Sequence, residues 1–147
     1  MIIAIVNGPN LNLTGRREPE FYGDTSFDVW LPEANRKFPG HKFTYFQSNH
    51  EGELIDFLQE KGPLFEGLIL NPGSLAHYGL SLADAVKNLT IPVVEVHLSM
   101  VYQREVWRHK LVIAPYCQAL ITGMGLNGYE YAIRFLLQTD DEASTLD

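Results

Sequence analysis

The sequence has a single cysteine among its 147 residues, so it can form neither an internal disulfide nor a cage of thiolate ligands. Its 11 lysines and arginines are outnumbered by 18 aspartates and glutamates, and the net charge of −7 opposes a non-specific grip on nucleic acid. No apolar run approaches the roughly 20 residues of a membrane helix, and no cationic leader precedes the first apolar segment. We therefore expect a cytoplasmic protein with no metal, nucleic-acid or membrane partner.

Three short catalytic motifs are also missing. The sequence has no G-x-x-x-x-G-K-[ST], H-E-x-x-H or G-x-S-x-G, so it gives no support to nucleotide hydrolysis, zinc proteolysis or serine hydrolysis. Residues 123–128 do match G-x-G-x-x-G, but a dinucleotide motif belongs in the first βα turn, well before the end of the sheet. We interpret these glycines as permitting a tight turn and close helix packing.

An alternation of strand-like and helix-like segments is present instead. Short apolar and β-branched runs predict five strands, at residues 2–6, 43–46, 68–70, 93–96 and 119–122. Helices are predicted from a capping box at 48–51 to Gly62, over 81–89 and over 128–137, with a frayed tail at 139–147. Residues 26–38 give a weaker helical pattern, because Pro32 falls inside it. The order predicts one domain, residues 1–147, with a flavodoxin-like, doubly wound, five-stranded parallel sheet.

In such a sheet ligands bind outside the carboxyl ends of the strands, so the residues that follow each strand indicate the site. Four of the five predicted strand ends carry Asn, Ser or His: residues 7–10, 47–49, 71–73 and 97–99. Receiver domains share this architecture, but they need clustered acidic residues at these ends. The amides found here predict a polar rim of a different kind.

The long loop at residues 7–24 contains Arg17 and Tyr22. A phenol with its usual pKa of about 10 is almost wholly protonated at neutral pH, and a neighbouring guanidinium lowers that pKa. Tyr22 beside Arg17 is therefore a candidate general base. The alternative is a half-buried loop aromatic next to a solvated charge.

A candidate acid ends the fourth predicted strand. Period-two alternation puts Glu95 and His97 on one face, where a carboxylate can orient an imidazole for proton transfer. A hydrogen-bonded histidine with only a structural role is the alternative. His77 could reach the same rim.

Six blocks of sequence belong together: NGPNLNL at 7–13, REPEFYG at 17–23, QSNHEG at 47–52, NPG at 71–73, IPVVEVHLS at 91–99 and REVWR at 104–108. In this order and spacing they resemble the type II 3-dehydroquinate dehydratases. The resemblance implies a flavodoxin-like subunit, assembled as a dodecamer of trimers, that converts 3-dehydroquinate to 3-dehydroshikimate in the shikimate or quinate pathway. It implies no metal and no organic cofactor.

The resemblance also implies roles for individual residues. Tyr22, with its pKa lowered by Arg17, would be the base, a water near Asn10 would stabilise the enolate, and His97 would protonate the departing hydroxyl. Further family positions that contact the substrate are matched by Asn71, His77, Leu98, Ser99 and Arg108. Asp84 matches a residue that reaches a neighbouring subunit's site. Arg104 is interpreted as structural or electrostatic and is left outside the site.

The chain departs from the family pattern at Met100, at Ser74–Gly79 and at residues 110–111. Two rival hypotheses stay open, and the departures motivate the first of them. One is a divergent dehydratase for a related cyclic hydroxy-keto acid. The other is a catalytically silent homologue that binds a metabolite, or a flavin carrier on the same fold.

Overall fold

A computed structural model describes residues 1–16, 18, 20 and 25–144 of the chain. They contain a five-stranded, fully parallel sheet with the order β2-β1-β3-β4-β5. The predicted doubly wound sheet is thereby confirmed. Each predicted strand is present, with one or two additional residues in four cases: β1 is Ile2–Asn7, β2 is Lys42–Gln47, β3 is Gly67–Asn71, β4 is Val93–His97 and β5 is Ala119–Thr122.

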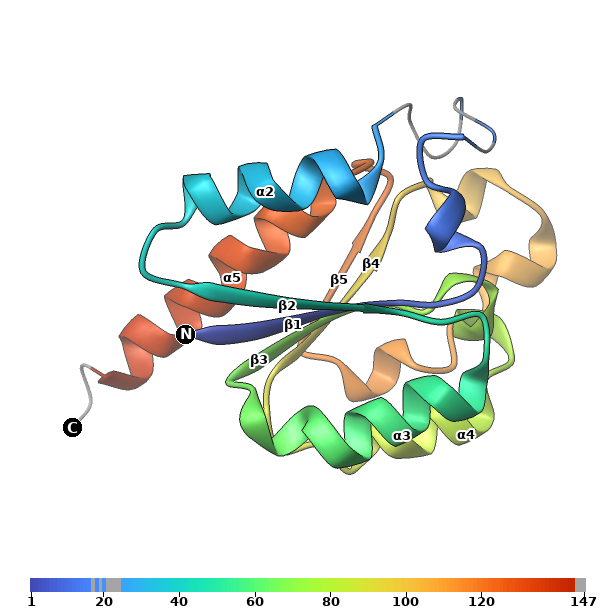
Figure 1. The fold of residues 1–147 in the computed structure, drawn as a ribbon. Helices are drawn as coiled ribbons and strands as arrows, with labels where there is room; N and C mark the ends of the chain where they lie inside the picture. Colours follow the sequence, from blue (N-terminus) through green and yellow to red (C-terminus); the bar gives the residue numbers. More distant parts are fainter. Residues whose placement is uncertain (17, 19, 21–24, 145–147) are drawn as a thin grey trace.

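Helices cover both faces of the sheet (Figure 1). The helices α2, Phe27–Lys37, and α5, Asn127–Ser144, lie on one face. The helices α3, Glu51–Lys61, and α4, Leu80–Lys87, lie on the other. The loops that leave the carboxyl ends of the strands gather at one edge of the sheet, where the site is built.

Alternation along the buried strands divides the core between the two faces. In β1, Ile3 and Ile5 pack into the cluster beneath α2 and α5, whereas Ala4 and Val6 pack into the cluster beneath α3 and α4. All four side chains are inaccessible to solvent. The continuous apolar runs of β1 and β3 thus reflect strands that are covered on both sides.

Two predicted helix ends are wrong. The capping box does not form: Ser48 Oγ accepts from the backbone N–H of His50 and also contacts the Glu53 carboxylate, while Glu51 Oε1 accepts from the N–H of Leu82 in α4. Glu51 therefore joins two helices instead of capping its own. The helix predicted to end at Leu137 continues, and the predicted frayed tail is helical in its backbone as far as Ser144.

Pro32 lies inside α2 without ending it. It has no N–H to donate to the carbonyl of Asp28, four residues earlier. Both residues are exposed, so water can satisfy that carbonyl, while Phe27 and Ala34 anchor the opposite face of the helix in the core. The tertiary packing therefore outweighs the local cost of the proline. No helix in the described part of the chain is long and apolar enough to span a membrane.

Candidate active site

The site begins between β1 and β3, where the strand order reverses. Asn7 and Asn71 are register partners at the carboxyl ends of these strands, and the N–H of Gly8 donates to the Asn71 carbonyl at 2.7 Å. A Cβ on Gly8 would lie 2.3 Å from the carbonyl oxygen of Pro72, so only glycine allows the two loops to approach this closely. The loop then turns through Asn10, whose φ of 68° is tolerated by asparagine.

Two buried amides at this edge share one tyrosine. The hydroxyl of Tyr129, on α5, donates to Asn7 Oδ1 at 2.8 Å and accepts from Asn71 Nδ2 at 2.9 Å. The backbone N–H of Gly73 donates to Asn71 Oδ1 at 3.1 Å. Because each of these contacts is satisfied, Asn71 is held in one orientation.

A buried carboxylate and imidazole end β4, as the alternation predicts. His97 Nε2 lies 2.6 Å from Glu95 Oε1, and Glu95 is fully buried. A carboxylate accepts, so Nε2 carries a proton, and Nδ1 is the nitrogen that remains for proton exchange with a ligand.

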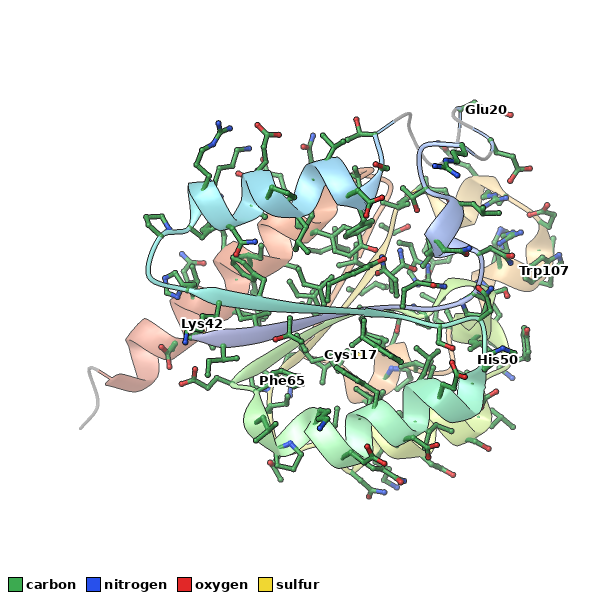
Figure 2. The ribbon with its side chains drawn as sticks, in the orientation of Figure 1. Glu20, Lys42, His50, Phe65, Trp107 and Cys117 are labelled. Atoms are coloured by element: carbon green, nitrogen blue, oxygen red, sulfur yellow. The ribbon has the colours of Figure 1, made fainter. Side chains whose placement is uncertain are left out.

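A thiol lies behind the carboxylate. Cys117 Sγ is 4.0 Å from Glu95 Oε2 and packs with the cluster beneath α3 and α4 (Figure 2). Burial, together with the smaller effect of the Glu95 charge, raises the pKa of Cys117 to about 12. The thiol therefore keeps its proton and is the donor in this contact.

His77 lies next to His97, with 6.1 Å between the ring centroids. Its Nδ1–H donates to the Lys110 carbonyl at 2.9 Å. Burial lowers the pKa of His77, and the charges of His97 and Arg108 lower it further, against the opposing effect of the Lys110 hydrogen bond. A neutral His77 can offer its Nε2 to a hydroxyl.

Two arginines come from the segment that follows β4. Arg104 has a side chain only 6% exposed, and its Nη1 donates to Ser99 Oγ at 3.3 Å. The Arg108 guanidinium lies 4.1 Å from the centre of the Trp107 ring, and its Nε donates to Glu105. Trp107 in turn meets His77 edge to face. Figure 2 shows Trp107 at the same edge as His50, opposite the edge that carries Lys42.

Part of this group, including Asn71, His77 and His97, lines a cavity of about 230 Å³. None of the described residues that line the cavity is an aspartate or a glutamate, so its charged and titratable side chains are histidines and arginines. The lining consists of Pro9, Asn10, Leu11, Asn71, Gly73, Ser74, His77, His97, Leu98, Ser99, Val101, Arg104, Trp107 and Arg108. The protein carries net negative charge, yet this cavity is locally basic. It suits a small anion that also bears hydroxyl groups. No group of three or more potential metal ligands occurs among the described residues.

The structure brings most of the predicted site residues to this one cavity. Its lining contains Asn10, Asn71, His77, His97, Leu98, Ser99 and Arg108. Asp84 is exposed on α4 and does not line it. Arg17 and Tyr22 lie outside the described residues.

Sequence reasoning missed three contributors. Arg104, which was left outside the site, lines the cavity, and so does Trp107. Their position directly after the strand that carries His97 is the signal that could have included them. Tyr129 was missed because it lies far along the chain from the two amides that it joins.

The departures from the family pattern lie mostly away from the cavity. Ser74 lines it, but Leu75 and Ala76 are buried in or beside the core, and Tyr78 is 61% exposed. Met100 packs against Gly123 and is absent from the lining.

The glycine motif at 123–128 supports β4, as the packing interpretation predicts. The N–H groups of Gly123 and Gly125 donate to the carbonyls of His97 and Leu98, at 3.3 and 3.0 Å. A Cβ on Gly128 would lie 3.2–3.3 Å from Ile121 and Val96, so this glycine allows α5 to pack closely on the sheet. The motif holds the end of β4 in place.

Comparison with known proteins gives one consistent result. The family model described as Dehydroquinase class II matches residues 1–137. The 3-dehydroquinate dehydratase of Roseiflexus castenholzii is 50% identical over 141 residues, which cover 95% of this chain and 90% of that protein. The enzyme of the same name from Bacillus subtilis is 47% identical over 135 residues, covering 90% and 91%.

A solved structure agrees. The type II dehydroquinase from Butyrivibrio crossotus superposes with a TM-score of 0.88 at 39% identity, covering 92% of this chain and 97% of that one. The similarity therefore extends over most of the chain.

Proposed function

Because this chain belongs to the class II dehydroquinase family, it dehydrates 3-dehydroquinate, and we propose that the reaction takes place in the basic cavity at the carboxyl end of the sheet. The observation that carries this proposal is the buried Glu95–His97 pair opening on a cavity walled by amides and arginines. An elimination next to a ketone needs a base, an acid and a stabiliser of the enolate. The whole chain would form one catalytic domain.

His97 is the proposed acid. Its Nε2–H is engaged by Glu95, so a second proton on Nδ1 makes an imidazolium that the buried carboxylate stabilises. As the carbon–oxygen bond breaks, the departing hydroxyl takes that proton and leaves as water. Glu95 keeps its negative charge throughout and holds the ring in position.

Tyr22 is the proposed base, assisted by Arg17. The phenolate takes the proton from the carbon next to the ketone, and the electron pair of that bond forms the enolate. Asn10, on the cavity wall beside the β1 exit, would hold the water that hydrogen-bonds to the enolate oxygen. The enolate then re-forms the ketone as the hydroxyl leaves.

The remaining wall residues would bind the substrate. Ser99 and the backbone of Leu98 would receive the carboxylate, and Arg104 beside Ser99 adds a positive charge to that end of the cavity. Asn71, His77 and Arg108 would hydrogen-bond the substrate's hydroxyl and ketone oxygens. The locally basic wall favours a carboxylate substrate over its neutral analogues.

Assembly into a dodecamer of trimers is part of the proposal. Asp84 would reach a neighbouring subunit's site from α4, and the start of this helix exposes Leu80, 66% accessible, beside Tyr78. Adjacent exposed apolar side chains are typical of an interface. The lone cysteine supports a cytoplasmic location for the assembly.

The test is direct. Purified protein, assembled as judged by light scattering, is mixed with 3-dehydroquinate without added metal, and the conjugated enone is followed by its ultraviolet absorbance. We expect the initial rate of the absorbance increase to be proportional to the protein concentration. If folded, assembled protein forms no enone, the assignment of the cavity is overturned.

A further inference from the structure

The proposed reaction makes no use of the hydroxyl of Tyr129. A buried hydroxyl lowers the stability of a protein unless it is hydrogen-bonded, so its presence here calls for a role. Tyr129 is fully buried on α5, within an aromatic cluster that includes Phe27 and Trp30. Its ring fills the core, a role that phenylalanine could perform. The hydroxyl instead reaches between two amides at the edge where β1 and β3 end.

The direction of each hydrogen bond in this group follows from its partners. The backbone N–H of Gly73 can only donate, so the atom that it meets on Asn71 is the oxygen. The amide nitrogen of Asn71 therefore faces Tyr129 and donates to it. The Tyr129 hydroxyl, which accepts there, uses its own proton on Asn7 Oδ1. Burial raises the pKa of Tyr129, so that proton remains in place.

This arrangement decides what Asn71 presents to the cavity. Its oxygen is engaged by Gly73 and one of its N–H groups by Tyr129, which leaves the second N–H for a ligand. With the opposite orientation, the same side chain would offer an acceptor. The orientation of the Asn71 amide thus decides whether this side chain can donate a hydrogen bond to a substrate oxygen.

We propose that Tyr129 is a positioning residue, which acts through Asn71 by holding its amide as a hydrogen-bond donor to the substrate. The inference rests on the proposed function, because it assumes that the substrate occupies the cavity that Asn71 lines. Tyr129 itself does not line the cavity. Its influence should therefore appear in substrate binding and should pass entirely through Asn71.

Tyr45 offers a matched control. It lies on β2, stacks on the same Phe27, and also places its hydroxyl near Asn7, at 3.4 Å from Nδ2. It makes no hydrogen bond to Asn71 among those of the described residues. Tyr45→Phe removes a partly buried hydroxyl from the same cluster but leaves both hydrogen bonds of the Asn71 side chain in place.

The experiment is a double-mutant cycle on KM and kcat, with Tyr129→Phe, Asn71→Ala, the combined variant and Tyr45→Phe. Loss of one buried neutral hydrogen bond should raise the KM of Tyr129→Phe about five- to tenfold and change kcat less. In the Asn71→Ala background the same substitution should not raise KM further, because there is no amide left to orient. Tyr45→Phe should change KM less than twofold.

Two results would overturn the inference. One is a Tyr129→Phe variant with the KM of Tyr45→Phe. The other is an equal increase in KM in the wild-type and Asn71→Ala backgrounds, which would indicate a general structural effect. Should Tyr129→Phe fail to fold, Asn7→Leu removes the acceptor of the Tyr129 proton and frees that hydroxyl to turn. Folded Asn7→Leu with an unchanged KM would overturn the inference equally. A wild-type protein without turnover would instead reject the proposed function.

Discussion

The two faces of the sheet supply the cavity with different chemistry. On the face covered by α3 and α4, alternation along β4 carries Val93, Glu95 and His97, so this face contributes a buried charge and a group that can exchange protons. On the face covered by α2 and α5, Asn7 and Asn71 meet Tyr129 in a wholly neutral group. Both groups are almost fully buried. In the proposed mechanism a proton moves on the first of these faces, whereas the second face supplies fixed dipoles.

The difference between the faces predicts different consequences of substitution. Changes on the charged face should lower kcat. Changes on the neutral face should raise KM and lower stability without altering the pH profile. The substitutions below are ordered from the largest expected effect to the smallest.

His97→Gln should remove the acid while keeping a group that can donate to Glu95. We expect kcat to fall by about 10²–10⁴, the usual contribution of a positioned acid. The measurement is the initial rate of enone formation, with melting shifts caused by a cyclic carboxylate analogue as the control for binding. A variant that retains wild-type kcat would assign the proton donor elsewhere.

Glu95→Gln keeps the shape of the partner but removes its charge. Because the His97 ring would lose the buried carboxylate that accepts from its Nε2–H, we expect kcat to fall about 10- to 100-fold. Initial rates should be measured at saturating substrate. A Glu95→Gln variant with the kcat of the wild type would show that the carboxylate is not needed for the proton transfer.

Asn71→Ala tests the neutral face. The Tyr129 hydroxyl and the Gly73 N–H each lose a partner, so we expect the free energy of unfolding to fall by about 1–3 kcal/mol. KM should rise while the pH profile of kcat keeps its wild-type shape. Urea denaturation and rate measurements across pH check both parts. A displaced pH profile would show that the two faces are coupled.

Met100→Asn should have the smallest effect and belongs to neither group. It restores the residue that the family pattern leads one to expect, but Met100 packs on Gly123 outside the cavity. We expect kcat/KM for 3-dehydroquinate to stay within about twofold of the wild-type value, because Met100 lines neither the cavity nor the buried groups beside it. A larger change, or altered preference across a panel of cyclic hydroxy-keto acids, would revive the divergent-dehydratase hypothesis.

Much of this organisation could be predicted from short stretches of sequence. The five strands follow from local apolar runs, and the Glu95–His97 pair follows from the two-residue period of a strand. The interpretation of residues 123–128 as a packing element required only their position at the end of the strand order. The assignment of Arg17 and Tyr22 remains a prediction, because both lie outside the described residues.

The sequence by itself therefore determined the order of the elements and which residues leave the sheet at the functional edge. Only the tertiary structure decided which distant groups come together: the Tyr129 hydroxyl meets Asn71, and the Glu51 carboxylate accepts from the N–H of Leu82. Backbone periodicity acts over a few residues and is visible locally. A hydrogen bond between residues 58 or 122 positions apart depends on how whole helices settle on the sheet, which no local pattern encodes.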